Sequence, residues 1–124
     1  MTTQDKTTAI YVRTAVHNKT GDQSLAMQEQ ACRTYAAALG WRVGEVFADE
    51  GIAGTRRDRP GMNRLLGAVR DGMVERVLMT RPDRVSRSHA DIKAILRELE
   101  ARGVECACVE QLGYLQALLP AESE

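Results

Sequence analysis

Along this chain, four short apolar segments alternate with three longer segments in which apolar residues recur every three or four positions. The short segments are rich in residues that favour strands, and they predict strands at residues 8–15, 41–47, 74–80 and 104–109. The longer segments predict helices over residues 24–39, 60–71 and 90–102. Ser24 suits the N-cap of the first helix, Pro60 suits the first turn of the second, and a glycine follows each helix.

The resulting order of elements is β-α-β-α-β-α-β, which is typical of α/β proteins. Right-handed crossovers between consecutive strands then give a mainly parallel sheet of four to five strands with helices on both faces. We therefore predict a single α/β domain over residues 1–110, and a tail over residues 111–124 that either forms a short helix or frays. In sheets of this kind, ligands bind at the carboxyl ends of the strands.

The composition is that of an ordinary globular domain, since 44% of the 124 residues are hydrophobic and 27% are charged. No apolar run approaches the ~18 residues that cross a bilayer, and the polar amino terminus does not resemble a signal peptide. Three cysteines are an odd number for a disulfide framework, and Cys32, Cys106 and Cys108 all fall at positions that favour core packing. We expect a cytoplasmic protein with reduced thiols, no metal and no membrane contact.

Positive charge is concentrated in one part of a chain whose formal net charge is zero. Residues 50–89 contain nine arginines and only five acidic residues. A solvated surface of mixed charge explains scattered charges, but here the arginines crowd into two segments that look like loops. This distribution favours an anion site on a neutral domain over a long electrostatic track along DNA.

The most informative residues follow two of the predicted strands. Arg13 lies at the end of the first strand, and residues 81–87 place one aspartate and three arginines directly after the third. Guanidinium groups are poor structural filler there, because an unpaired buried charge costs several kcal/mol. Planar, permanently charged groups that converge can instead bind a phosphodiester and stabilise the charge that develops at phosphorus. At position 15, where such a site needs a nucleophilic hydroxyl, the chain has alanine.

Five short motifs resemble, in order and spacing, the catalytic domain of serine recombinases of the resolvase/invertase type. The motifs are Tyr11-Val12-Arg13, Ser24-Leu25 with Gln28, Asp49–Thr55, Arg59-Pro60-Gly61 and Asp83–Arg87. The resemblance implies the α/β fold already predicted, and DNA strand cleavage and exchange through a phosphoserine link without metal or high-energy cofactor. It assigns catalytic positions to Arg13, Arg59, Asp83, Arg84 and Arg87. Further candidates for contact with DNA phosphates are Arg56, Arg57 and Arg81.

The chain departs from the family pattern at the nucleophile, because Ala15 stands where the family has serine. A second serine that is usual in the family is also replaced, by Ala53. Thr14 is not expected to take over, because side chains alternate along a strand and its hydroxyl points away from the arginine at the strand end. Ser86 and Ser88 are alternative hydroxyls, although turn formation explains them better. The family's long dimerisation helix and DNA-binding region are not expected within these residues.

Three functions follow as hypotheses. The first is a degenerate recombinase domain that has kept its phosphate-binding arginines and lost its nucleophile. The second is a non-catalytic module that modulates an intact recombinase, by pairing with it, with a second copy of itself, or with DNA. The third is another phosphoryl-transfer enzyme with a water nucleophile, which lacks an evident base or metal site. Asp83 is either a proton donor or an ion-pair partner of a nearby arginine. Any DNA binding by this chain alone is expected to be weak and independent of sequence.

Overall fold

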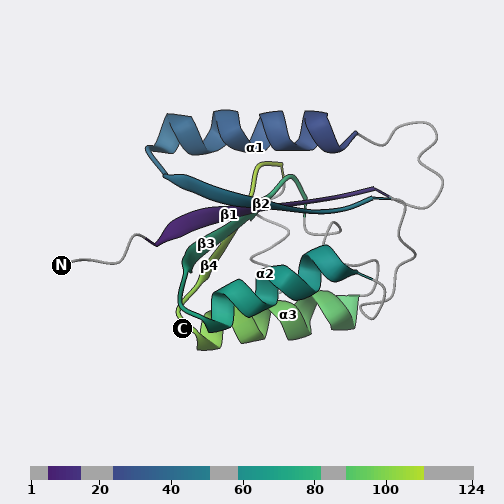
Figure 1. Cartoon of the computed structure of the whole chain (residues 1–124), viewed down its shortest axis with the longest axis vertical. Coiled ribbons are helices and arrows are strands. Elements are labelled where there is room, and N and C mark those ends of the chain that lie inside the picture. The colour runs from purple at the N-terminus through teal and green to yellow at the C-terminus, as the bar shows by residue number, and fades with distance from the viewer. Residues whose placement is uncertain (1–5, 15–23, 51–58, 82–88, 111–124) are drawn as a thin grey trace.

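Strands and helices alternate along the chain in the order that the sequence predicts (Figure 1). The computed structural model describes residues 6–14, 24–50, 59–81 and 89–110. Within these ranges the strands are β1 (Thr7–Arg13), β2 (Val43–Asp49), β3 (Val74–Met79) and β4 (Glu105–Cys108). The helices are α1 (Leu25–Leu39), α2 (Pro60–Arg70) and α3 (His89–Ala101). The tail over residues 111–124 lies outside the described residues, so the division of the chain at residue 110 stays a prediction.

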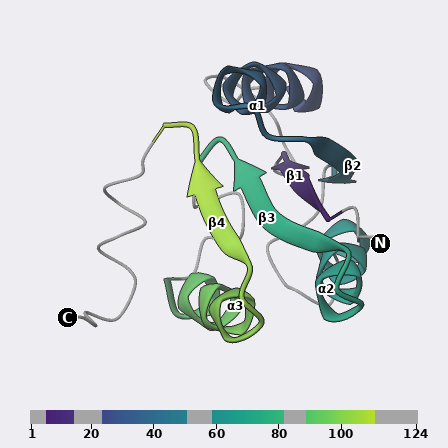
Figure 2. The same cartoon turned by 90° about the vertical axis from the view of Figure 1, so that its left-hand side faces the viewer.

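The strands form one parallel sheet in the spatial order β2-β1-β3-β4. Helix α1 covers one face of the sheet, and α2 and α3 cover the other (Figure 1). A view turned by 90° shows α1 above β1 and β2, with α3 below β4 (Figure 2). The predicted α/β fold class is confirmed, with four strands in the described part of the chain. The direction of winding reverses between β1 and β3, which is where α/β sheets open a crevice for ligands.

Helix α1 begins and ends where the local sequence predicts. At its start, Ser24 Oγ accepts a hydrogen bond from the backbone N–H of Met27 at 3.1 Å. At its end, Gly40 adopts a left-handed conformation with φ of 74°. The N–H of Trp41 then donates to Ala36 O at 2.9 Å, which completes the closing turn that a glycine at this position allows.

The bounds of β2 differ from the predicted residues 41–47 at both ends. The strand begins at Val43 because the turn that closes α1 uses Trp41. It continues past Phe47 to Asp49 because its pairing with β1 runs on to the pair formed by Arg13 and Asp49. The extra residues matter for the site, since they bring a carboxylate beside the end of β1.

Two apolar layers pack against the sheet. The smaller layer, under α1, contains Ile10, Val12, Cys32, Ala36, Leu78 and Ala107. The larger layer lies between the sheet and the helices α2 and α3, and Ala9 and Tyr11 belong to it. Strand β1 therefore contributes apolar side chains to both faces, as the sequence predicts for a buried strand of a parallel sheet.

The described helices are amphipathic and belong to the surface of the domain. Helix α2, for example, buries Met62, Leu65, Leu66 and Val69 against the sheet and leaves Arg64 exposed. None of the helices in the described ranges is long and apolar enough to cross a membrane.

The three cysteines lie among apolar residues, as predicted. Cys32 and Cys108 are buried, and Cys106 packs partly buried against the larger apolar layer. Burial raises the pKa of Cys32 to about 12, and the negative charges of Glu110 and Glu29 add to the shift. Burial also raises the pKa of Cys106 to about 12. Both thiols therefore stay protonated at physiological pH.

We expect Cys32 to react slowly with Ellman's reagent in the native protein at about pH 8, because the reactive species is the thiolate. In concentrated urea all three thiols should react rapidly. The pKa of Cys32 is higher in the folded protein than the ordinary thiol pKa of 9.0, so proton binding to this thiol stabilises the fold. The contribution is complete at pH values below 9.0 and is lost as the pH rises through about 12. Rapid labelling of Cys32 in the native protein, located by peptide mass mapping, would contradict the burial.

Candidate functional site

Arg13 lies at the carboxyl end of β1, where the winding of the sheet reverses, and is only 6% exposed. Ala9 and Tyr11, earlier on the same strand, pack in the layer beside α2 and α3. Because side chains alternate along a strand, the Arg13 side chain leaves the sheet on that same face. The guanidinium group of Arg13 is thus directed toward the face that α2 and α3 cover, and the amino ends of both helices lie at this edge of the sheet (Figure 1).

The backbone of Arg13 is held by a side chain from α1. On the β2 side, Thr14 N–H donates to Asp49 O at 3.1 Å, so the N–H and C=O of Arg13 point toward β3. The ladder between β1 and β3 has ended before this point. The Gln28 side chain makes the two backbone hydrogen bonds that β3 does not make here. Its Oε1 accepts from Arg13 N–H at 3.1 Å, and its Nε2 donates to Arg13 O at 2.9 Å. Gln28 is fully buried and fixes the position from which the arginine side chain departs.

Asp49 ends β2 beside Arg13 and has a buried carboxylate, since the residue is 2% exposed. Its Oδ2 accepts a hydrogen bond from the Tyr11 hydroxyl at 2.7 Å and one from Met62 N–H at 2.9 Å. Its Oδ1 accepts from Gly61 N–H at 2.7 Å. The carboxylate therefore serves three buried donors at once.

Two of these donors are amides at the start of α2, so Asp49 caps a helix that begins later in the chain, at Pro60. Arg59 is the N-cap residue of α2, but its side chain makes no capping hydrogen bond. Asp49 supplies both the acceptors and the negative charge that the amino end of a helix favours. Gly61 permits the approach, because a Cβ atom at this position would lie 2.5 Å from Ala48 O.

The Tyr11 hydroxyl lies near both Asp49 and Arg59. Burial and the Asp49 carboxylate raise the pKa of Tyr11 well above its usual range, and the opposing effect of Arg59 is smaller. Tyr11 therefore stays protonated at physiological pH and donates to Asp49. Its role is to hold the carboxylate rather than to act as a phenolate.

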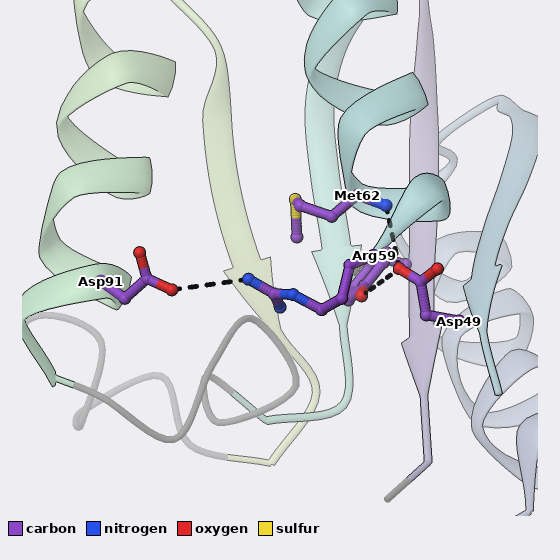
Figure 3. A network of polar contacts seen from close by, with 5 residues as sticks. Asp49, Arg59, Met62 and Asp91 are labelled. Atoms are coloured by element: carbon purple, nitrogen blue, oxygen red, sulfur yellow. Dashed lines mark hydrogen bonds and ion pairs between the residues drawn. The ribbon is translucent and has the colours of Figure 1, made fainter. Parts of the chain in front are cut away.

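Arg59 extends from the start of α2 toward the start of α3 (Figure 3). The side chain is fully buried, and its Nη2 lies 3.5 Å from Asp91 Oδ2. Asp91 belongs to the first turn of α3, and its side chain is 19% exposed. Figure 3 shows the guanidinium group directed at Asp91, with Asp49 on the opposite side of the Arg59 backbone.

Of the predicted site residues, the structure describes Arg13, Arg59 and Arg81. Arg81 follows β3 and is partly buried. All three belong to the edge of the sheet where the strands end, and two of them flank the reversal between β1 and β3. The remaining predicted positions lie outside the described residues and stay predictions: Ala15, Arg56, Arg57, Asp83, Arg84 and Arg87.

The described part of this edge is chemically suited to binding an anion. It contains permanently charged guanidinium groups close to the surface of the sheet edge, and the backbone of Arg13 is fixed by buried hydrogen bonds. The Asp49 carboxylate has a structural role, because it accepts hydrogen bonds from three buried donors. Thr14, the residue that follows β1, is buried.

Three residues that organise this edge, Gln28, Asp49 and Asp91, were not among the predicted site residues. Gln28 and Asp49 belong to the motifs that resemble the family, although no role was predicted for either. Gln28 also occupies the same stripe of α1 as the buried Cys32 and Ala36. Asp49 lies beyond the predicted end of its strand, which hid its position in the sheet. Asp91 resembles an ordinary acidic residue in the first turn of a helix, where the helix dipole alone explains a carboxylate.

Comparison with known protein families identifies the fold and its relatives. A sequence profile described as "Resolvase, N terminal domain" matches residues 8–117. The chain belongs to this resolvase family. The match includes all the strands and helices of the described residues except the first residue of β1, and the predicted membership in the serine recombinases is confirmed.

Two curated relatives of this resolvase-family domain come from Staphylococcus aureus. Transposon Tn552 DNA-invertase BinR is 32% identical over 92 residues, which are 74% of this chain and 43% of the relative. Transposon Tn552 resolvase is 29% identical over 92 residues, which are 74% of this chain and 42% of that protein. The chain thus spans less than half the length of these relatives.

Solved structures show the same fold. The N-terminal catalytic domain of TP901-1 integrase is similar with a TM-score of 0.79 and 25% identity, and the match covers 91% of each chain. The C-terminal catalytic domain of ISC1926 TnpA, an IS607-like serine recombinase, has a TM-score of 0.71 and 27% identity. That match covers 90% of this chain and 76% of the other.

Proposed function

We propose that this resolvase-family domain binds the phosphodiester backbone of DNA through the arginines at the carboxyl edge of its sheet, and that it does not cleave DNA. The observation that carries the proposal is the fixed placement of Arg13 by Gln28 at the same edge as Arg59. The relatives are named as a DNA-invertase and a resolvase, which supports DNA as the ligand. Because these relatives come from a bacterium, whose DNA lies in the cytoplasm, the proposed place of action is the cytoplasm.

The proposed roles follow from the chemistry of guanidinium groups. One anion site surrounds the phosphate that corresponds to the cleaved phosphate in an active recombinase, and it is formed by Arg13, Arg59, Arg84 and Arg87. Asp83 acts there as a proton donor or as an ion-pair partner. Arg56, Arg57 and Arg81 contact neighbouring phosphates. Because a few such contacts supply all the affinity, binding by this chain alone is weak, on the order of 10⁻⁴ to 10⁻⁶ M at physiological salt, and independent of base sequence.

The proposed loss of cleavage rests on Ala15. In a serine recombinase a hydroxyl oxygen attacks phosphorus, a phosphorus–oxygen bond to the DNA breaks, and the enzyme stays linked to the DNA. Alanine has no oxygen that can form this bond, and arginines cannot replace it. The buried Tyr11 hydroxyl does not substitute, because it remains protonated and bonded to Asp49.

A second candidate function is a non-catalytic module that pairs with an intact recombinase or with a second copy of itself. The observation that favours it is the combination of retained arginines with a methyl group at position 15. Such a domain would still bind DNA phosphates while a partner supplied the nucleophile.

The chain is expected to form no covalent DNA adduct. End-labelled duplex incubated with the protein and run on a denaturing gel should show no protein-linked 5′ end. We expect little or no restored cleavage in Ala15→Ser, since Ala53 also differs from the family pattern. A labelled band that resists denaturation but disappears with protease, in the unaltered protein, would contradict the proposal.

A further inference from the structure

The contact between Arg59 and Asp91 has the properties of an exchangeable ion pair. Arg59 is 0% exposed, so an anion from solvent reaches its guanidinium group only when a neighbouring group moves. The distance from Nη2 to Oδ2 is 3.5 Å, whereas a strong hydrogen bond between a guanidinium and a carboxylate is about 2.7–2.9 Å long. The Asp91 side chain, in contrast, is 19% exposed, so it contacts both the buried guanidinium and the solvent.

Asp49, the other carboxylate near Arg59, cannot serve as an exchangeable partner. Its two oxygens accept hydrogen bonds from Tyr11, Gly61 and Met62, at distances of 2.7 to 2.9 Å. Displacing it would leave two amides at the start of α2 and a buried hydroxyl without an acceptor. Of these two carboxylates, only Asp91 can move away from Arg59 without uncapping α2.

We infer that Asp91 is an internal counter-anion which holds the place of a phosphate on Arg59, and that a phosphate group binds Arg59 by displacing the Asp91 carboxylate. The inference rests on the proposed function, because it concerns the same anion site. It makes Asp91 a residue that sets the affinity of the site. Phosphate binding then requires a shift of the first turn of α3 or of the Asp91 side chain.

The exchange conserves the charge balance around Arg59. A buried guanidinium is costly without an opposite charge nearby, and Asp91 supplies such a charge to Arg59. A phosphodiester supplies the same negative charge and offers two oxygens to the planar guanidinium fork. The displaced carboxylate remains at the amino end of α3, where the helix dipole favours a negative charge.

The expected consequence is that Asp91 weakens phosphate binding by competing for Arg59. If the pair is closed for nine-tenths of the time, the apparent dissociation constant is about tenfold higher than in a protein without this competitor. Asp91→Asn retains the size of the side chain and removes its charge. It should therefore bind phosphate about tenfold more tightly than the unaltered protein.

Glu98→Gln is a matched control for the loss of one negative charge. Glu98 lies on the same helix, and its side chain is 23% exposed, close to the 19% of Asp91. It pairs with Arg70 at 2.8 Å rather than with Arg59. Loss of net negative charge alone would raise phosphate affinity by a similar, small factor in both variants. Displacement predicts the large effect in Asp91→Asn and a change of less than about twofold in Glu98→Gln.

The probe is inorganic phosphate, titrated into ¹⁵N-labelled protein and followed by the resonances of the arginine Nε–Hε groups and of the backbone amides. Tighter binding in Asp91→Asn than in Glu98→Gln supports the inference, and equal affinities in these two variants overturn it. In the unaltered protein, the first-turn amides of α3 must shift with the same dissociation constant as Arg59 Hε. A response of Arg59 without one from α3 overturns the inference even if Asp91→Asn fails to fold.

Arg59→Gln separates the inference from the proposed function. Phosphate affinity that is unchanged in Arg59→Gln would overturn the anion site itself, and the inference with it. Affinity that depends on Arg59 but is no tighter in Asp91→Asn than in Glu98→Gln would overturn the inference alone.

Discussion

Replacing Asp49 with alanine is expected to lower the free energy of unfolding by about 4 kcal/mol, because each buried donor that loses its acceptor costs roughly 1–3 kcal/mol. The donors are the hydroxyl of Tyr11 and the backbone amides of Gly61 and Met62. The variant also removes a negative charge from the amino end of α2, where Arg59 provides no side-chain cap. For a domain with a total stability of about 5–15 kcal/mol, the fold would be severely weakened.

Urea denaturation followed by far-ultraviolet circular dichroism measures this effect. Glu50→Ala is the matched control, because Glu50 is the next residue in the chain and is exposed. It should change the free energy of unfolding by less than about 0.5 kcal/mol. If Asp49→Ala and Glu50→Ala unfold at the same urea concentration, Asp49 is not the cap of α2.

Gln28→Leu is the second large effect, with an expected loss of about 3 kcal/mol in the free energy of unfolding. Leucine has a similar size but cannot accept from Arg13 N–H or donate to Arg13 C=O, and both groups are buried. The next strand does not take over, because the pairing of β1 with β3 has ended before Arg13. The variant should also release the end of β1 and weaken anion binding.

Hydrogen exchange at the amide of Arg13 gives a local readout of the same change. The amide should be protected in the unaltered protein and exchange much faster in Gln28→Leu. Gln30→Leu is the control, since Gln30 lies on the same helix and bonds Thr34 Oγ1 at 3.1 Å on the exposed surface. Fast exchange at Arg13 in the unaltered protein would show that Gln28 does not hold the strand end.

Gln28 and Asp49 stabilise different parts of the same edge of the sheet. Gln28 fixes the backbone from which Arg13 departs, and Asp49 fixes the start of α2, where Arg59 is the N-cap residue. Loss of either support is expected to reduce anion binding through a change in position rather than through a change in charge at an arginine. Anion affinity measured alongside stability therefore tests the site as well as the fold.

The sequence by itself determined the order of the strands and helices along the chain and the class of the fold, and it supplied the arginines on which the proposed site rests. Periodic burial of apolar residues is a local property, so the alternation of strand and helix can be predicted from short windows. The ends of α1 were likewise predictable, because Ser24 and Gly40 act through bonds to nearby backbone atoms. Arg13 and Arg81 could be placed at one edge because all strands of a parallel sheet end on the same side.

Only the tertiary structure decided which partners hold these residues. Gln28 reaches Arg13 across 15 positions of sequence, Arg59 reaches Asp91 across 32, and Tyr11 reaches Asp49 across 38. The end of β2 was also set by its neighbour, since pairing with β1 extends the strand to Asp49. Such contacts depend on which distant segments of the chain lie side by side in the folded protein. A local pattern of apolar and polar residues carries no information about which segments these are.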